Sequence, residues 1–234
     1  MDAALLYVLI IGFVCVAGFI AAMGAYIEWL RSKRLGELAA ELGLEFKRPR
    51  NRALYRELHF IDDLREGDDQ YAYNVLSGVY RGWYIMAFDF HWVVWTTGPN
   101  GEAQKESINA SVFVVRPEMH MPELRIYPEC FFSKLGRMIG FKDIELESIE
   151  FSKKYVVKSQ DKRFAYDVCH PRFMEYLMPF HNLTLEYHRD CIATKHESRT
   201  PPDKFRLNID RMVDIADLLP EYVRRDHAHS DARP

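Results

Sequence analysis

The sequence lacks the short motifs that most often reveal a reaction. Its four cysteines form no Cys-x-x-Cys pair, and its 12 glycines form neither a G-x-G-x-x-G nor a G-x-x-x-x-G-K-[ST] loop. The first absence gives no support to a thiolate zinc or dithiol redox site, and the second disfavours nucleotide binding. No motif therefore calls for a cofactor, and we expect none.

A large excess of charge of one sign is missing as well. The formal net charge is -3 and the isoelectric point is near 6.3, so the chain has no global basic field of the kind that draws proteins onto nucleic acid. The aromatic stretch 83–95 contains no Lys or Arg, and we interpret its rings as core side chains rather than base-stacking platforms. We therefore expect no nucleic-acid partner.

What the chain does have is one long uncharged run, from Ala3 to Ile27. As a helix, these residues would extend roughly 37 Å, which exceeds a hydrocarbon core of about 30 Å. The alternative of a cleaved signal peptide is disfavoured because no positive charge precedes the run and the run is too long. A buried helix of a soluble protein is disfavoured because no polar face interrupts it. The sequence predicts a transmembrane helix over residues 3–27, with the lipid bilayer as the first partner.

The two ends of this run carry the residues typical of a membrane interface. Aromatic rings of the kind that favour the headgroup level stand near both ends, and basic residues follow only the second end. These interface residues are Tyr7, Tyr26, Trp29, Arg31, Lys33 and Arg34. The positive flank predicts an amino terminus outside and a domain in the cytosol of a single-pass inner (cytoplasmic) membrane protein. Three widely spaced cysteines in that domain agree with a reducing compartment.

Small residues recur at helical spacing inside the predicted span. Ala17, Ala21 and Ala25 share one face, and such a face allows two membrane helices to approach closely. A homo-oligomer formed through this helix is therefore possible, although alanine is also common in membrane helices that do not pair.

After the span, the pattern predicts an α+β protein: a juxtamembrane linker helix over 28–46, a cytosolic domain over 47–223 and a disordered tail over 224–234. The domain pattern is mostly antiparallel strands with short covering helices. A strand over 71–80, a break at Arg81 and Gly82, and the aromatic strand 83–95 indicate a hairpin, and 107–115 indicates a third strand. A final hairpin (183–187 and 191–195) precedes an amphipathic helix over 203–219.

The segment from Ile144 to Lys195 resembles a family of uncharacterised bacterial membrane-anchored proteins, a domain of unknown function. The resemblance lies in an E-x-x-x-F-x-x-x-Y-x-V strand, an Asp-containing turn, an A-Y-x-[LV] strand and a P-x-[FM]-M-x-x-L helix. The matching residues are Glu147, Phe151, Tyr155, Val157, Asp161, Ala165, Tyr166, Val168, Pro171, Phe173, Met174 and Leu177. The resemblance implies a membrane-tethered module, with no catalytic residues to transfer.

Two acid-x-His pairs are the candidates for a metal site. Asp89 and His91 lie on the less apolar face of the aromatic strand, and Glu118 and His120 repeat the spacing in a proline-rich stretch. Residues two apart on a strand point the same way, so each pair could offer an oxygen and a nitrogen ligand. The competing interpretation is a hydrogen-bonded pair at a sheet rim.

These observations favour a membrane-tethered, noncatalytic interaction or scaffold module with a protein partner of unknown identity. A first alternative is a metal-assisted hydrolase that acts near the membrane through the two acid–histidine pairs. A second is a structural subunit of a membrane complex that uses the alanine face. Whether the protein is an enzyme is not decided by the sequence, and the missing motifs favour that it is not.

Overall fold

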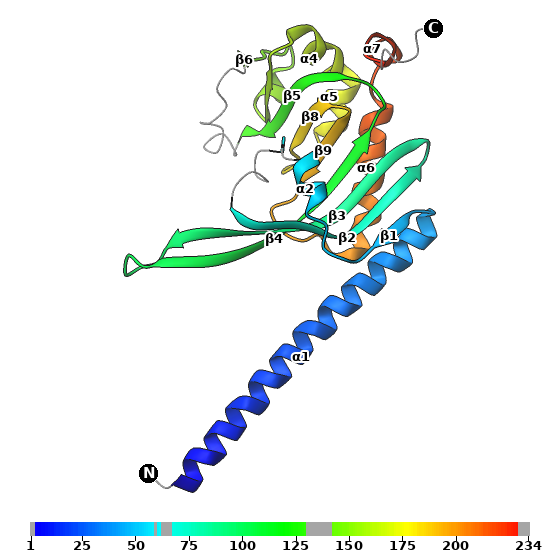
Figure 1. Cartoon of the computed structure of the whole chain (residues 1–234). Coiled ribbons are helices and arrows are strands. Elements are labelled where there is room, and N and C mark those ends of the chain that lie inside the picture. The colour runs from blue at the N-terminus through cyan, green and yellow to red at the C-terminus, as the bar shows by residue number, and fades with distance from the viewer. Residues whose placement is uncertain (1–2, 59, 62–66, 130–141, 229–234) are drawn as a thin grey trace.

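The structure is a computed structural model that describes residues 3–58, 60–61, 67–129 and 142–228. The helices are α1 (Ala3–Leu42), α2 (Ala53–Glu57), α3 (Ile149–Ser152), α4 (Lys162–Val168), α5 (Pro171–Leu177), α6 (Phe205–Asp217) and α7 (Glu221–Asp226), with a 3-10 turn at Pro202–Lys204. The strands are β1 (Glu45–Lys47), β2 (Asp68–Tyr80), β3 (Trp83–Thr97), β4 (Ala103–Arg116), β5 (Met121–Pro128), β6 (Lys142–Asp143), β7 (Tyr155–Ser159), β8 (Leu185–Arg189) and β9 (Cys191–Lys195). Figure 1 shows α1 leaving this α+β domain as a long stalk.

The described strands form one antiparallel sheet in the order β1-β2-β3-β4-β9-β8-β5-β7-β6. The predicted meander is confirmed: β2 pairs with β3, and β3 with β4, over long registers. Arg81 and Gly82 both have positive φ, 50° and 87°, which is the two-residue turn that joins strongly twisted strands. The predicted final hairpin is present as β8 and β9, with residues 183–184 lying before its first strand.

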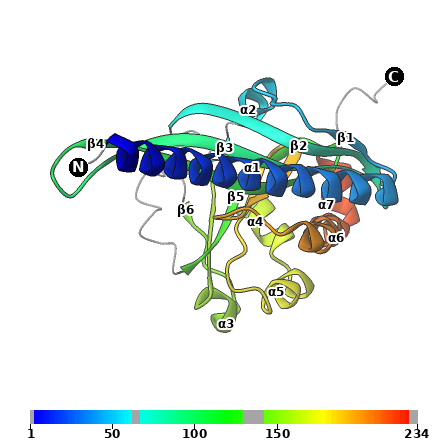
Figure 2. The same ribbon diagram turned by 90° about the horizontal axis from the view of Figure 1, so that it is seen from below.

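Both faces of the sheet are covered. The alternate β3 residues Met86, Phe88, Phe90 and Trp92 pack in one core with α2, whereas Ile85 and Ala87 belong to a second and larger core with α6 and the end of α1. The ring of Phe113 on β4 meets that of Phe205 on α6 edge to face at 5.0 Å. The middle of the face that the sequence marks as less apolar, from Ile85 to Asp89, is therefore also buried, because helices cover it (Figure 2).

Helix α1 runs without a break from the apolar segment into the domain. Its first part is long and apolar enough to cross a membrane, with a mean hydropathy of 2.3, and its described side chains there are exposed. Its last part buries Leu35, Ala39 and Leu42 in the larger core. The helix ends at Leu42 because Gly43, at φ 72°, reverses the chain and lets the Leu44 amide donate to the Ala39 carbonyl at 2.8 Å.

Two predicted boundaries need correction. The linker helix expected over 28–46 ends at Leu42, and residues 45–47 form β1, which pairs with β2. The tail expected to be disordered from residue 224 is ordered further: α7 extends to Asp226, and Ala228 bridges Met119. Val223 anchors this helix by its burial in the larger core. Residues 229–234 lie outside the described residues.

The segment that carries the family resemblance also differs in part. Pro171–Leu177 is the expected helix, but Ala165, Tyr166 and Val168 lie on helix α4 rather than on a strand. Asp161 begins that helix by accepting a hydrogen bond from the Phe164 amide at 3.0 Å. Because Phe164, Ala165 and Val168 are buried at helical spacing, a helix satisfies both the core and the backbone here.

Candidate functional site

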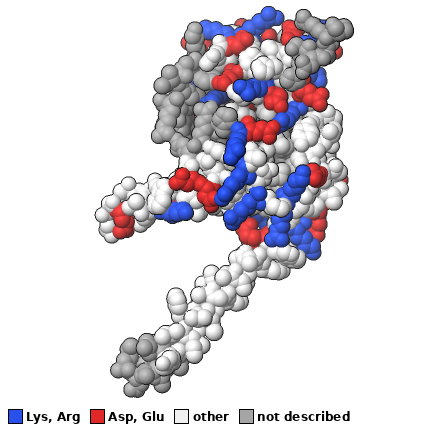
Figure 3. Space-filling model, in the orientation of Figure 1, with Lys and Arg blue, Asp and Glu red and all other residues white. Residues whose placement is uncertain are grey.

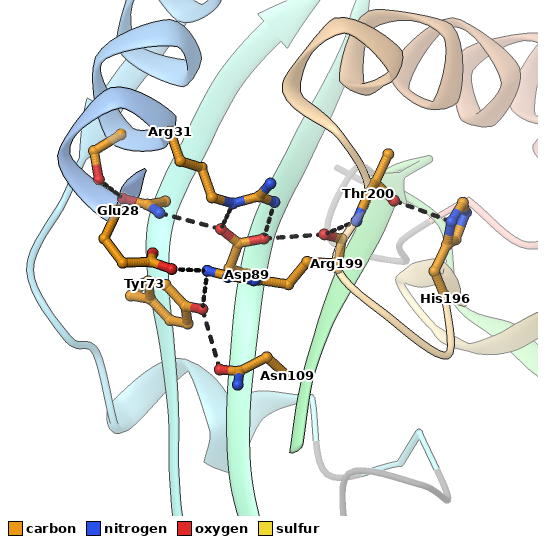
Figure 4. Close-up of polar contacts among 11 residues, drawn as sticks. Glu28, Arg31, Tyr73, Asp89, Asn109, His196, Arg199 and Thr200 are labelled. Atoms are coloured by element: carbon orange, nitrogen blue, oxygen red, sulfur yellow. Dashed lines mark hydrogen bonds and ion pairs between the residues drawn. The ribbon is translucent and has the colours of Figure 1, made fainter. Parts of the chain in front are cut away.

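The densest polar cluster lies where α1 enters the domain, around the carboxylate of Asp89 on β3. This carboxylate is fully buried and accepts four hydrogen bonds from three side chains (Figure 4). Arg31 of α1 donates two of them, at 2.8 Å and 2.6 Å. Asn74 donates one at 3.1 Å, and Ser111 donates another at 3.0 Å. All of its charge is thus compensated inside the protein, as a buried carboxylate requires.

An irregularity in β2 creates one arm of this cluster. Tyr73 pairs with Asp89 and Leu76 with Ala87, so β2 has one more residue than β3 between these pairs. Asn74 sits in this bulge with φ 51°, a left-handed conformation that asparagine tolerates better than most residues. The bulge turns its amide toward Asp89, and its oxygen accepts a hydrogen bond from Ser32 of α1 at 2.8 Å. Two consecutive residues of α1 are therefore bound to the sheet.

The cluster continues across β4 into the segment that follows β9. The Ser111 hydroxyl accepts a hydrogen bond from the Thr200 amide at 2.9 Å, and the Thr200 hydroxyl lies 3.0 Å from Nδ1 of His196. Burial lowers the pKa of His196 to about 4, with the Arg211 charge acting in the same direction. His196 is therefore a neutral, half-buried side chain at physiological pH.

A second branch lies closer to the apolar part of α1. Arg199 donates to Glu28 of α1 at 2.6 Å and lies 3.4 Å from the Tyr73 hydroxyl. Tyr73 in turn donates to the side-chain oxygen of Asn109, which also lies 3.1 Å from Nδ1 of His91. Burial, with a smaller effect of the Asp89 charge, raises the pKa of Tyr73 to about 12, so this phenol keeps its proton.

A pocket of about 470 Å³ opens beside this branch. Its walls come from α1, the connection after β1, β2, β4 and the segment before α6; they include Glu28, Arg48, Arg50, Tyr73, Asn109 and Arg199. The guanidinium of Arg50 stands 4.5 Å above the ring of Tyr71, which stacks on His91 at 4.7 Å. Cationic, phenolic and amide groups thus converge on one cavity at the base of α1.

Comparison with known proteins adds one likeness. No family model matches the sequence, and no curated protein matches it either. The fold is similar to the "crystal structure of the mycobacterial trehalose monomycolate transport factor A, TtfA", with a TM-score of 0.56 and 13% sequence identity over 81% of this chain and 96% of that chain. At this identity the likeness shows the fold alone.

The structure does not bring the two acid–histidine pairs together. Asp89 pairs with Ser111 in the register of β3 and β4. Glu118 lies two residues after Arg116, and Arg116 pairs with Tyr84, which stands five residues before Asp89 on β3. His91 faces Asn109, and the His120 amide donates to the carbonyl of His227. In the described part of the chain, no three His, Cys, Asp or Glu side chains are placed to hold a metal ion. The Asp89 carboxylate is instead occupied by Arg31, so the predicted four-residue metal site is wrong.

The predicted interface residues divide into two groups. Tyr7, Tyr26 and Trp29 are exposed on α1, Lys33 stands over the Trp29 ring at 5.5 Å, and Arg34 is exposed. Arg31 is different, because its side chain is only 10% exposed and points into the domain. Ala17, Ala21 and Ala25 are all exposed along α1, which leaves their face open to a partner helix.

The sequence contains one signal for the cluster. Asp89 is the only charged residue in the stretch 83–95, and a buried carboxylate needs a cation and donors nearby. That rule predicts a partner but cannot name Arg31, Asn74 or Ser111, which come from three other elements. Glu28, Tyr73, Asn109 and Arg199 carry no recognisable pattern.

Proposed function

We propose that this protein is a single-pass, membrane-tethered and noncatalytic interaction module that holds its sheet domain at the cytoplasmic face of a membrane. The observation that carries this proposal is the attachment of α1 to the sheet. The same helix that is apolar and exposed at its start is bound to the domain by Arg31 and Ser32 and by a buried apolar face. The domain therefore follows the helix without a flexible linker, so that a membrane around the helix fixes its position and orientation.

The sidedness of the proposal rests on charge and on thiols. Basic residues follow the apolar run closely, which favours a cytoplasmic domain. Cys169 and Cys191 are free and buried, and burial raises the pKa of each thiol to about 12. Such thiols are unreactive and need no oxidising compartment, in agreement with a cytosolic location.

The polar cluster supports a binding role rather than a reaction. Its carboxylate is neutralised by Arg31, and its phenol at Tyr73 keeps its proton. The similar solved structure is named a transport factor, and an accessory role in a membrane machinery is compatible with that name. We infer the same class of role for this chain, with a protein partner at the membrane, and do not extend the cargo named there to it.

The test exchanges the membrane helix and keeps the domain. Residues 3–27 are replaced by an unrelated membrane helix of equal length, and the full chain, the exchanged chain and a chain of residues 28–234 are compared. The full and exchanged chains should resist carbonate extraction from membranes and co-purify with the same near-stoichiometric protein partner after gentle solubilisation. The short chain should be released. Release of the full chain by carbonate would refute the tether, and loss of the partner on helix exchange would assign partner binding to the membrane helix instead.

The noncatalytic part of the proposal has its own test. The triple variant His91→Gln, Glu118→Gln, His120→Gln removes the titratable groups of both acid–histidine pairs except the structural Asp89. In a strain that lacks the wild-type gene, this variant should rescue the deletion phenotype as fully as the wild-type chain does. A variant that is expressed and folded but fails to rescue the phenotype would support the enzyme interpretation instead.

A further inference from the structure

Two cations in the connection after β1, Arg48 and Arg50, form no ion pair with any carboxylate that the structure describes. The chain has seven Lys and Arg residues between positions 31 and 52, and within the part the structure describes four of them form ion pairs with the protein's own carboxylates. These pairs are Arg31 with Asp89, Lys33 with Glu37, Lys47 with Glu45, and Arg52 with Asp69. Arg34, Arg48 and Arg50 have no carboxylate partner among the described residues, and of these three Arg48 and Arg50 line the 470 Å³ pocket.

The pocket offers more than these two charges. Arg199 lines it as well, but its charge is balanced by Glu28 at 2.6 Å. The Asn109 oxygen accepts from Tyr73, which leaves the amide NH₂ group as a donor beside the cavity. Arg50 is oriented by the Tyr71 ring below it. A preoriented guanidinium, a second arginine and an amide donor make a suitable set for the tetrahedral oxygens of a phosphate.

The position of the pocket relative to the apolar run indicates where such a phosphate would come from. Glu28 forms part of its wall and is the first residue after the apolar run that ends at Ile27. If residues 3–27 span the hydrocarbon, the pocket lies at the depth of the lipid headgroups. Figure 3 shows Lys and Arg side chains gathered on the surface where α1 meets the domain.

We propose that the pocket lined by Arg48, Arg50 and Asn109 binds the phosphate of an anionic lipid headgroup in the membrane that α1 crosses. The bound lipid would add a second attachment between domain and bilayer, on the side of the sheet that α1 occupies. The inference rests on the proposed function in one respect, which is that α1 lies in a membrane.

The probe is dioctanoyl phosphatidylglycerol, titrated into the full-length protein in an uncharged detergent and followed by native mass spectrometry. Dioctanoyl phosphatidylcholine and inorganic phosphate are titrated in parallel. The test variant is Arg48→Gln, Arg50→Gln. Its matched control is Lys162→Gln, Arg172→Gln, which removes the same charge from exposed positions away from the pocket. Thermal unfolding of each variant verifies that the fold is retained.

We expect the wild-type chain and the control to bind one phosphatidylglycerol saturably, and the test variant to bind it at least tenfold more weakly. Equal weakening in the control would mean general electrostatic attraction and would overturn the inference. Equal binding of phosphatidylcholine, or binding of inorganic phosphate as tight as that of the lipid, would also overturn it. Carbonate extraction is measured on the same chains. A chain that stays in the membrane but binds no lipid refutes this inference alone, whereas a released chain refutes the proposed tether.

Discussion

Arg31 of α1 and Asp89 of β3 lie 58 positions apart in the sequence and form a two-point ion pair at 2.8 Å and 2.6 Å. The exposed fractions of the two side chains are 10% and 0%, so water screens this pair little. It is the main polar attachment of the stalk to the domain. Its partner groups on Asn74 and Ser111 complete the coordination of the carboxylate.

We predict that Arg31→Ala destabilises the full-length protein by about 3–5 kcal/mol, because removal of one partner leaves a buried carboxylate uncompensated. In a domain of this size the unfolding midpoint should fall by roughly 10 °C. Tryptophan fluorescence during heating in detergent measures it. Arg34→Ala is the control, since Arg34 is exposed on the same helix. The double variant Arg31→Leu, Asp89→Leu should be more stable than Asp89→Leu alone, and the reverse order would contradict the assigned pair.

We predict that Asn74→Gly and Asn74→Ala differ in stability. Both lose the hydrogen bonds to Asp89 and Ser32, which costs about 1–3 kcal/mol. Only the alanine must also hold φ near 51°, which adds roughly 1 kcal/mol, whereas glycine adopts that angle freely. Denaturant titration of the two variants would therefore rank glycine above alanine. Equal stabilities would mean that the bulge relaxes when the side chain is removed.

The sequence predicts most of the local structure and little of the cluster. The hairpin turn at Arg81 and Gly82 and the long apolar run are set by residues close together in the sequence, so they can be predicted without knowledge of the fold. Asp89 was visible as a lone charge in an aromatic strand, but its partners depend on a bulge at Asn74 and on the approach of α1, neither of which has a pattern of its own. The sequence indicates the membrane interface for Arg31, because a basic residue just after the span suits that place as well as it suits a pair with a buried carboxylate.

We predict that the protein loses stability as the pH falls from about 6.5 to about 4, in part through His196. Its pKa in the folded state is about 4 because burial disfavours the charged form, whereas the unfolded chain takes up the proton near pH 6.5. The unfolded state therefore binds more protons in this window, and the contribution present above pH 6.5 is lost on acidification. The loss amounts to at most about 3 kcal/mol. Unfolding midpoints at pH 7 and pH 5 should differ less for His196→Gln than for the wild-type chain. An unchanged difference would assign the pH response to other groups.

We predict that Ala21→Leu weakens any self-association of α1 in a membrane, because the larger side chain keeps two helices apart at the face shared with Ala17 and Ala25. Gly12→Leu is the matched control. Gly12 lies nine residues earlier, on the opposite side of the helix, and a side chain there meets no other part of the protein. Crosslinking in native membranes measures the dimer fraction. If both variants reduce it equally, the alanine face is not the contact.

The attachment of α1 places the domain boundary at the end of the apolar run, rather than at residue 47 as the sequence indicated. A chain of residues 28–234 keeps Arg31, Ser32 and the buried apolar face of α1, and it loses only residues that are not packed on the domain. We predict that it is soluble and unfolds cooperatively.

A chain of residues 43–234 lacks all of these groups. It leaves Asp89 without its cation and uncovers the part of the larger core that contacts Leu35, Ala39 and Leu42. We predict that it aggregates or fails to unfold cooperatively, and size-exclusion chromatography with thermal unfolding distinguishes the two chains. Comparable stability of both chains would show that α1 tethers the domain without contributing to its stability. A large difference would mean that the last turns of the stalk are part of the domain, so that a force or a tilt imposed on the helix in the membrane reaches β3 through the Arg31–Asp89 ion pair and the buried apolar face of α1.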